Sequence, residues 1–148
     1  MNGIEAELKA LTENVPHLIA NLANSAALLF EKLENVNWAG FYMMKDGRLV
    51  LGPFCGKPAC IEIPVGKGVC GSAVSQDRIL AVADVHSFAG HIACDGASRS
   101  EIVVPLHAHG KIWGVLDVDS PVENRFTDES LSEFLAYGRI IESFIARG

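Results

Sequence analysis

Long apolar runs are missing from this 148-residue sequence, and none approaches the roughly 18 residues that a membrane-spanning helix needs. The first residues, Met-Asn-Gly-Ile-Glu-Ala-Glu, also lack the basic start and apolar centre of a signal peptide. Hydrophobic residues make up 49% and charged residues 20% of the chain, which is typical of a soluble globular protein. We therefore expect a single cytoplasmic domain that covers residues 1–148.

Clustered positive charge is also missing. The chain has 12 Lys and Arg against 18 Asp and Glu, which gives a formal net charge of -6. Proteins that bind nucleic acid or an anionic membrane need basic patches for this purpose. The charge pattern therefore excludes both partners and favours a small-molecule ligand or another protein.

A closely spaced Cys-x-x-Cys pair does not occur among the four cysteines, which weighs against a structural zinc site. The residues that such a site would use are Cys55, Cys60, Cys70, Cys94, His86 and His91. In the reducing cytoplasm, cysteines are more often catalytic, redox-active or simply buried than joined in structural disulfides. We expect no metal site here and treat the thiols as candidates for redox or nucleophilic chemistry.

Hydrophobic periodicity predicts helices near both ends of the chain. Apolar residues recur at three- and four-residue steps over 16–33, where Pro16 suits a first turn and Asn14 a cap, and a shorter helix is expected within 1–12. A third helix begins near Thr127, a cap residue followed by acidic residues, and runs to the C-terminus.

Strands are predicted between these helices. Asp46-Gly47 and His109-Gly110 each separate two apolar runs, a pattern typical of β-hairpins. The segments predicted as strands are 37–44, 48–54, 61–65, 78–82, 101–109 and 111–120. A short helix over 71–76 and a loop over 84–100 complete the order. Hairpins impose antiparallel pairing, so we expect an α+β domain in which the terminal helices together cover one face of the sheet and the loop lies on the other.

Two cysteines compete for the role of nucleophile. Cys94 lies in the predicted loop beside Asp95, where its thiol is expected to be partly accessible. Cys70 precedes the helix predicted at 71–76, whose N-terminal dipole would stabilise a thiolate. Cys60 lies in a short connector that suits a resolving thiol, whereas Cys55 has no evident role. The residues alone leave Cys70 and Cys94 as alternatives.

Acidic residues on neighbouring strands form a second candidate feature. Asp117 and Asp119 are two positions apart on a predicted strand, so their carboxylates share one face. Together they can hold an ammonium group, and crowding raises the pKa of one so that it can donate a proton. Glu101 opens the adjacent strand and is either part of this group or a solvated, arginine-paired charge. Trp38 and Tyr42 are either core aromatics or the wall of a pocket.

Several ordered motifs then give the chain a specific resemblance. They are Asn37-Trp38-Ala39-Gly40-Phe41-Tyr42, Gly56-Lys57-Pro58-Ala59-Cys60, Gly66-Lys67-Gly68-Val69-Cys70-Gly71, Asp84-Val85-His86, Gly90-His91-Ile92-Ala93-Cys94-Asp95, Ser100-Glu101-Ile102-Val103 and Gly114-Val115-Leu116-Asp117-Val118-Asp119-Ser120. With these motifs the sequence closely resembles the free methionine-(R)-sulfoxide reductases, which are single GAF domains. The resemblance runs from about Asn21 to Asp128.

The resemblance implies a GAF-like fold, with a six-stranded antiparallel sheet between helices packed on both sides. It also implies reduction of free L-methionine-(R)-sulfoxide to L-methionine, which is an oxidative stress repair reaction. Members of the family commonly form homodimers and are recycled by thioredoxin, with no bound cofactor or metal. The alternative is a GAF-type small-ligand or redox-sensor module without turnover.

Residue roles follow from the same resemblance. Cys94 would be the nucleophile, Cys60 the main resolving thiol and Cys70 an auxiliary thiol. The acids would hold the substrate and protonate its oxygen, and Trp38 would pack on its methyl group. The substrate-binding set is then Trp38, Tyr42, Glu101, Asp117 and Asp119.

Overall fold

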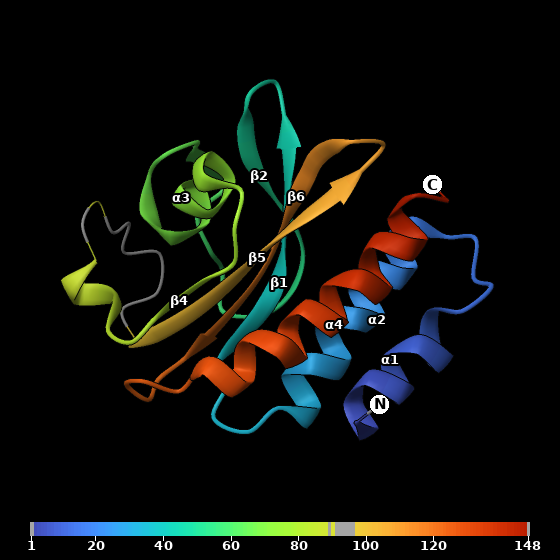
Figure 1. Ribbon diagram of the computed structural model, residues 1–148, viewed down its shortest axis with the longest axis horizontal. Helices are drawn as coiled ribbons and strands as arrows, with labels where there is room; N and C mark the ends of the chain where they lie inside the picture. Colours follow the sequence, from blue (N-terminus) through green and yellow to red (C-terminus); the bar gives the residue numbers. More distant parts are fainter. Residues whose placement is uncertain (1, 89, 91–96, 148) are drawn as a thin grey trace.

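A six-stranded antiparallel sheet forms the centre of the protein, in the strand order β3-β2-β1-β6-β5-β4 (Figure 1). The computed structural model describes residues 2–88, 90 and 97–147. Its strands are β1 (Trp38–Lys45), β2 (Arg48–Gly56), β3 (Glu62–Pro64), β4 (Leu80–Val82), β5 (Ser100–Ala108) and β6 (Lys111–Ser120). Its helices are α1 (Gly3–Thr12), α2 (Leu18–Lys32), α3 (Gly68–Gln76), the 3-10 turn η1 (Val85–Ser87) and α4 (Asp128–Ile145).

Both predicted hairpins are confirmed, and their turns explain why they form. Asp46 and Gly47 have φ angles of 53° and 81°, and His109 and Gly110 have φ angles of 54° and 77°. Two successive positive φ angles define the turn whose twist matches that of paired strands. β1 therefore pairs with β2, and β5 pairs with β6.

One face of the sheet packs against α2 and α4, as predicted, and α1 packs on these two helices (Figure 1). Alternation along the strands turns Phe41, Ile102, Leu116 and Val118 to this side, where all four are buried. α4 begins directly after Thr127, whose N–H donates to the Ser130 hydroxyl. This layer contains the larger of the two clusters of buried apolar residues.

Two helix starts differ from the prediction. α2 begins at Leu18 rather than Pro16, because Asn14 adopts a left-handed conformation (φ 61°) in the turn after α1 instead of capping α2. α3 begins at Gly68 rather than Gly71, since the glycine-rich turn itself enters the helix. Cys70 therefore lies inside the first turn of α3 and not before the helix.

The opposite face of the sheet carries α3 and a second apolar cluster. Its fully buried aromatic residues are Trp38 and Tyr42, which lie beside Val69 and Cys70 of α3. The structure thus shows the GAF-like arrangement with helices on both sides of the sheet. That residues 1–148 form one domain stays a prediction. Within the described part of the chain, no helix is both long and apolar enough to span a membrane.

His107 on β5 joins the two helical layers. Its Nε2 lies 2.7 Å from Oδ1 of Asp77, which caps the end of α3, and its Nδ1 lies 3.1 Å from Oε2 of Glu142 on α4. With a carboxylate at each ring nitrogen, the protonated imidazolium form can donate a hydrogen bond to both. Partial burial lowers the pKa of His107, but the hydrogen bonds and charges of Asp77 and Glu142 outweigh it and raise the pKa overall.

This bridge predicts a pH-dependent contribution to stability. The folded-state pKa of His107 lies above its unfolded value of about 6.5, so the stabilisation is complete below pH ~6.5 and is lost as pH rises through the folded pKa. We expect the difference in unfolding free energy between the wild type and His107→Gln, from urea titrations, to shrink over that range. Asparagine also tolerates the left-handed backbone at position 77. In Asp77→Asn, the stabilisation by His107 should therefore be lost at a lower pH than in the wild type. A difference that grows with pH would contradict this assignment.

Candidate active site

The strand register places the predicted acids and Trp38 on the same face of the sheet. Asp119 on β6 is opposite Trp38 on β1 and Glu101 on β5, so these three residues form one row across three strands. Asp117 lies in the next row of that face, opposite Gly40 and Val103. The arrangement confirms the prediction that the two aspartates share a face.

Asp117 is the most deeply buried of the acids, with 5% of its surface exposed. Burial, followed by the nearby charges of Asp119 and Glu101, raises its pKa well above the usual range. A carboxyl in such surroundings is held in its neutral form and can donate a proton. The direction of this shift agrees with the expectation that crowding of the carboxylates raises the pKa of one of them.

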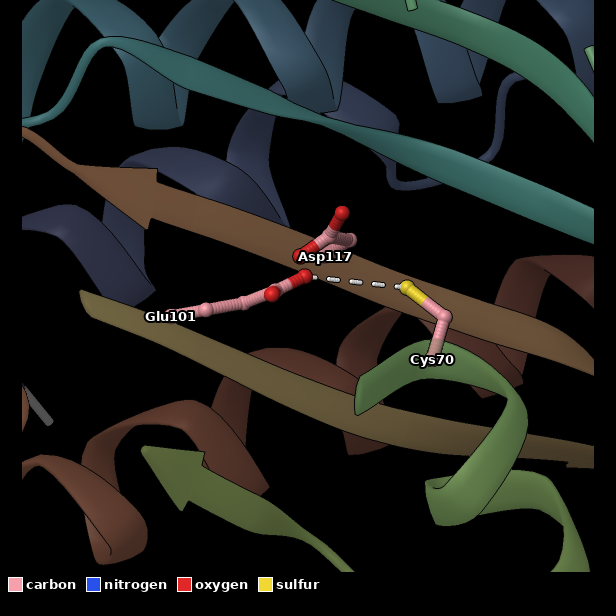
Figure 2. A group of neighbouring side chains, drawn as sticks. All are labelled: Cys70, Glu101 and Asp117. Atoms are coloured by element: carbon pink, nitrogen blue, oxygen red, sulfur yellow. Dashed lines mark hydrogen bonds between the residues drawn. The ribbon is translucent and has the colours of Figure 1, made fainter. Parts of the chain in front are cut away.

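Cys70 approaches the same acids from α3. Its Sγ lies 3.8 Å from Oε2 of Glu101, to which the thiol donates, and Asp117 lies beside both (Figure 2). Burial, followed by the charges of Asp117 and Glu101, raises the pKa of Cys70 well above its ordinary value. The expectation that the α3 dipole would stabilise a Cys70 thiolate is therefore wrong. Desolvation and the neighbouring carboxylates outweigh the dipole and keep the thiol neutral.

Glu101 is half-buried and belongs to this group. The alternative, an arginine-paired charge, is not what the described residues show, because Arg99 contacts other acids. The Nη2 atom of Arg99 lies 3.3 Å from Oε2 of Glu123 and 3.8 Å from Oδ2 of Asp84. Glu101 is thus left facing Cys70 and Asp117.

Trp38 is held flat between two aromatic rings. Its ring centroid is 5.2 Å from that of Phe54 and 6.0 Å from that of Tyr42, with interplanar angles of 15° and 24°. The indole Nε1 donates to the carbonyl of Lys57 at 3.1 Å. Only 2% of Trp38 is exposed, so its ring is part of the core cluster and at the same time borders the row of acids.

Phe54 and two glycines complete this stack, and the sequence analysis did not identify them. A Cβ atom on Gly40 would lie 2.3 Å from Phe54 Cβ and 2.9 Å from Trp38 Cη2, and one on Gly56 would lie 2.6 Å from Trp38 Cδ1. Both positions must lack a side chain for the indole to lie flat. A register shift between Gly40 and Tyr42 pairs Gly40 with Phe54, whereas the two-residue turn alone would pair it with Pro53, so no local signal in the sequence points to this contact.

Tyr42 connects the sheet to the segment that carries Cys60. Its hydroxyl donates to the carbonyl oxygen of Cys60 at 2.9 Å, and burial raises the pKa of the phenol, so it stays a donor. Cys60 is disulfide-bonded, whereas Cys55 and Cys70 carry free thiols. Cys55 packs toward the terminal-helix side of the sheet, away from the acids. Cys94, His91 and Asp95 lie outside the described residues.

Described residues within the predicted loop make backbone hydrogen bonds that fix their positions. The Gly68 N–H at the start of α3 donates to the carbonyl of Gly90 at 2.9 Å, and the Val85 N–H donates to the carbonyl of Arg99 at 2.7 Å. Asp84 caps the 3-10 turn η1 by accepting from the His86 N–H. Gly90 therefore lies at the start of α3, and Val85 lies beside Arg99.

Comparison with known proteins places this chain in a defined family. The GAF domain family matches residues 8–142. The free methionine-R-sulfoxide reductase of Escherichia coli is 55% identical over 126 residues, which cover 85% of this chain and 76% of that protein.

Two solved structures of fRMsr of Staphylococcus aureus are similar as well, each at 50% sequence identity. The reduced form has a TM-score of 0.94 and covers 97% of this chain and 93% of that chain. The complex with substrate has a TM-score of 0.92 and covers 97% of this chain and 94% of that chain. Both the sequence and the fold of this chain therefore match the same group of proteins.

The close approach at Gly40 gives a test of the aromatic stack. Gly40→Ala should destabilise the protein by about 1–3 kcal/mol, because the added methyl group must displace Phe54 or Trp38. The near-UV circular dichroism of the stacked rings should also weaken. Gly3→Ala is the matched control, since nothing lies within 4 Å of a Cβ there. A Gly40→Ala protein as stable as this control would mean that the stack does not require the glycine.

Proposed function

The chain belongs to the GAF domain family and, within it, to the free methionine-R-sulfoxide reductases, and on this basis we propose that it reduces free L-methionine-(R)-sulfoxide to L-methionine. The observation that carries the proposal is the buried Asp117 carboxyl, kept neutral beside Glu101 and Asp119 and facing the aromatic stack of Trp38. An oxygen leaving a sulfoxide must be protonated, and a neutral acid at this position can supply the proton.

Substrate recognition would use both parts of the site. The ammonium group of a free amino acid is attracted by the acidic row of Asp119 and Glu101, which lie opposite each other on β6 and β5. The methyl group on the sulfoxide sulfur would pack against Trp38, with Tyr42 completing the wall. A peptide-bound methionine sulfoxide has no ammonium group to offer, which accounts for a preference for the free amino acid.

The chemical step would take place at Cys94. Its thiolate attacks the sulfoxide sulfur, Asp117 or a neighbouring acid protonates the oxygen, and the oxygen passes to Cys94 as a sulfenic acid while methionine leaves. The Cys60 thiol then attacks the sulfenic acid sulfur and forms a disulfide, releasing water. An external dithiol, proposed to be thioredoxin, reduces this disulfide by exchange and becomes oxidised itself.

Two features of the described residues support this division of labour among the thiols. Cys70 is buried beside carboxylates and neutral, which suits an auxiliary role rather than that of the attacking thiolate. Cys60 is already disulfide-bonded, and its backbone is held by Tyr42. We further propose that the protein acts as a homodimer in the cytoplasm.

Substrate selectivity is the direct test of this function. With thioredoxin, its reductase and reduced nicotinamide cofactor supplied, the protein should release methionine from free methionine-R-sulfoxide, but not from the S epimer or from a peptide-bound sulfoxide. The readout is chromatographic methionine yield together with consumption of the reduced nicotinamide. Oxidation of the thiols without turnover on any of the three substrates would instead favour the redox-sensor alternative.

Cysteine variants test the proposed roles. Cys94→Ser should reduce turnover by at least about 10³-fold, the order of loss expected when a catalytic nucleophile is removed. Cys55→Ser, which alters a free thiol on the opposite side of the sheet, is the matched control and should retain wild-type turnover. Normal thioredoxin-dependent activity in Cys94→Ser would refute the assignment.

Cys60→Ser should separate the first step from recycling. We expect about one methionine per active site in a single turnover, followed by arrest with a sulfenic acid that a specific trapping reagent labels. If Cys70 replaces Cys60, steady turnover persists in Cys60→Ser and is lost only in the double variant with Cys70→Ser. Failure to form even one methionine in Cys60→Ser would contradict a purely resolving role.

A further inference from the structure

Three side chains from different elements converge on one point of the site. Cys70 comes from the first turn of α3, Glu101 from β5 and Asp117 from β6, and their sulfur and carboxylate oxygens lie within 4.8 Å of one another (Figure 2). β5 and β6 are the two strands of one hairpin, but α3 is separated from them in the sequence by β4 and η1, so spacing alone could not reveal the group. A thiol and two carboxylates form a set of ligands that zinc accepts in proteins.

The spacing of the donor atoms agrees with the size of a zinc ion. Zinc–sulfur bonds of about 2.3 Å and zinc–oxygen bonds of about 2.1 Å, at tetrahedral angles, place the two ligand atoms about 3.6 Å apart. Cys70 Sγ and Glu101 Oε2 are 3.8 Å apart. The shift needed for both atoms to reach a shared ion is therefore a few tenths of an ångström.

The buried carboxyl of Asp117 supplies an independent indication. The residue is 5% exposed, and its Oδ1 has no hydrogen-bond partner among the groups of the described chain. Buried carboxyl oxygens nearly always have a partner, because desolvation without one costs about 1–3 kcal/mol. The side chain that carries this oxygen lies beside a thiol and a second carboxylate, where it can contribute a ligand to a cation.

We propose that Cys70, Glu101 and Asp117 bind Zn²⁺ or a similar borderline-soft divalent ion, and that the ion and the substrate exclude each other. The second part rests on the proposed function, because it takes Glu101 and Asp117 as substrate-binding residues. A thiolate ligand selects zinc over Mg²⁺ and Ca²⁺, which prefer six or more oxygen ligands. Three protein ligands leave one position of a tetrahedral ion for water.

Charge and access both fit this assignment. Zn²⁺ held by one thiolate and two carboxylates gives a net charge of -1, and its binding would release the protons of the Cys70 thiol and the Asp117 carboxyl. Glu101 is half-buried rather than enclosed, and it gives the ion a route from solvent to Cys70. The ion would occupy the space that a substrate ammonium group would otherwise take between the acids.

Metal binding by the disulfide-closed protein tests the site without requiring activity. In that form Cys60 is unavailable, and Cys55 and Cys70 are the free thiols of the described chain. Equilibrium dialysis against Zn²⁺ should show one ion bound per chain, with excess Mg²⁺ unable to displace it. Cd²⁺ should produce the near-ultraviolet charge-transfer absorption of a metal–thiolate bond.

Matched variants locate the ligands. Cys70→Ser should abolish the Cd²⁺ absorption and weaken Zn²⁺ binding at least about 10-fold, the lower bound expected for loss of a ligand. Glu101→Gln and Asp117→Asn should weaken binding to a similar degree, and Cys55→Ser should leave it unchanged. Far-ultraviolet circular dichroism confirms that each variant is folded. Zinc binding that is absent, or that is equal in the wild type and Cys70→Ser, would overturn the proposal.

Competition with the substrate tests the second part. Saturating methionine-R-sulfoxide should raise the apparent dissociation constant for Zn²⁺ in the disulfide-closed protein, which cannot turn the substrate over. Methionine-S-sulfoxide controls for chelation of zinc by a free amino acid. An equal effect of the two epimers would refute mutual exclusion. Failure of the proposed function would show separately, as absence of methionine release by the reduced protein.

Discussion

The burial of Asp117 among other acids is the constraint on which the rest of the site depends. A carboxyl that is 5% exposed and flanked by Asp119 and Glu101 can be accommodated only if it is neutral or meets a positive charge. The fold tolerates this because the opposite face of the same sheet is closed by α1, α2 and α4 around a large apolar core. Stability is thus concentrated on one face, and the polar cluster that reduces it lies on the other.

The same constraint explains the environment of Cys70. A thiol in the first turn of a helix ordinarily benefits from the helix dipole, yet here burial and two carboxylates dominate. Whichever species enters the cluster, whether proton, ammonium group or metal ion, must supply positive charge. Proton donation, binding of an amino acid and binding of zinc are therefore alternative ways to satisfy one electrostatic requirement.

Much of the fold followed from local signals. Asp46-Gly47 and His109-Gly110 determined the hairpins, and the alternation of Asp117 and Asp119 placed both on one face. Helix starts were less predictable, because the glycine-rich turn before Cys70 continues into α3 and Asn14 adopts a left-handed turn. The cluster of Cys70 with Glu101 and Asp117, and the stack of Phe54 on Trp38, depend on contacts between distant segments. No periodicity in a single stretch encodes such contacts.

The hydrogen bond from Tyr42 to the Cys60 carbonyl has a kinetic meaning if Cys60 resolves a sulfenic acid. By anchoring the backbone at that residue, it limits the volume that the sulfur explores and so raises its effective molarity toward the oxidised partner. A sulfenic acid that meets a thiol early is diverted from sulfinic acid, whose formation is irreversible outside the 2-Cys peroxiredoxins. A single phenolic hydroxyl would in this way protect the enzyme from the oxidants whose damage it repairs.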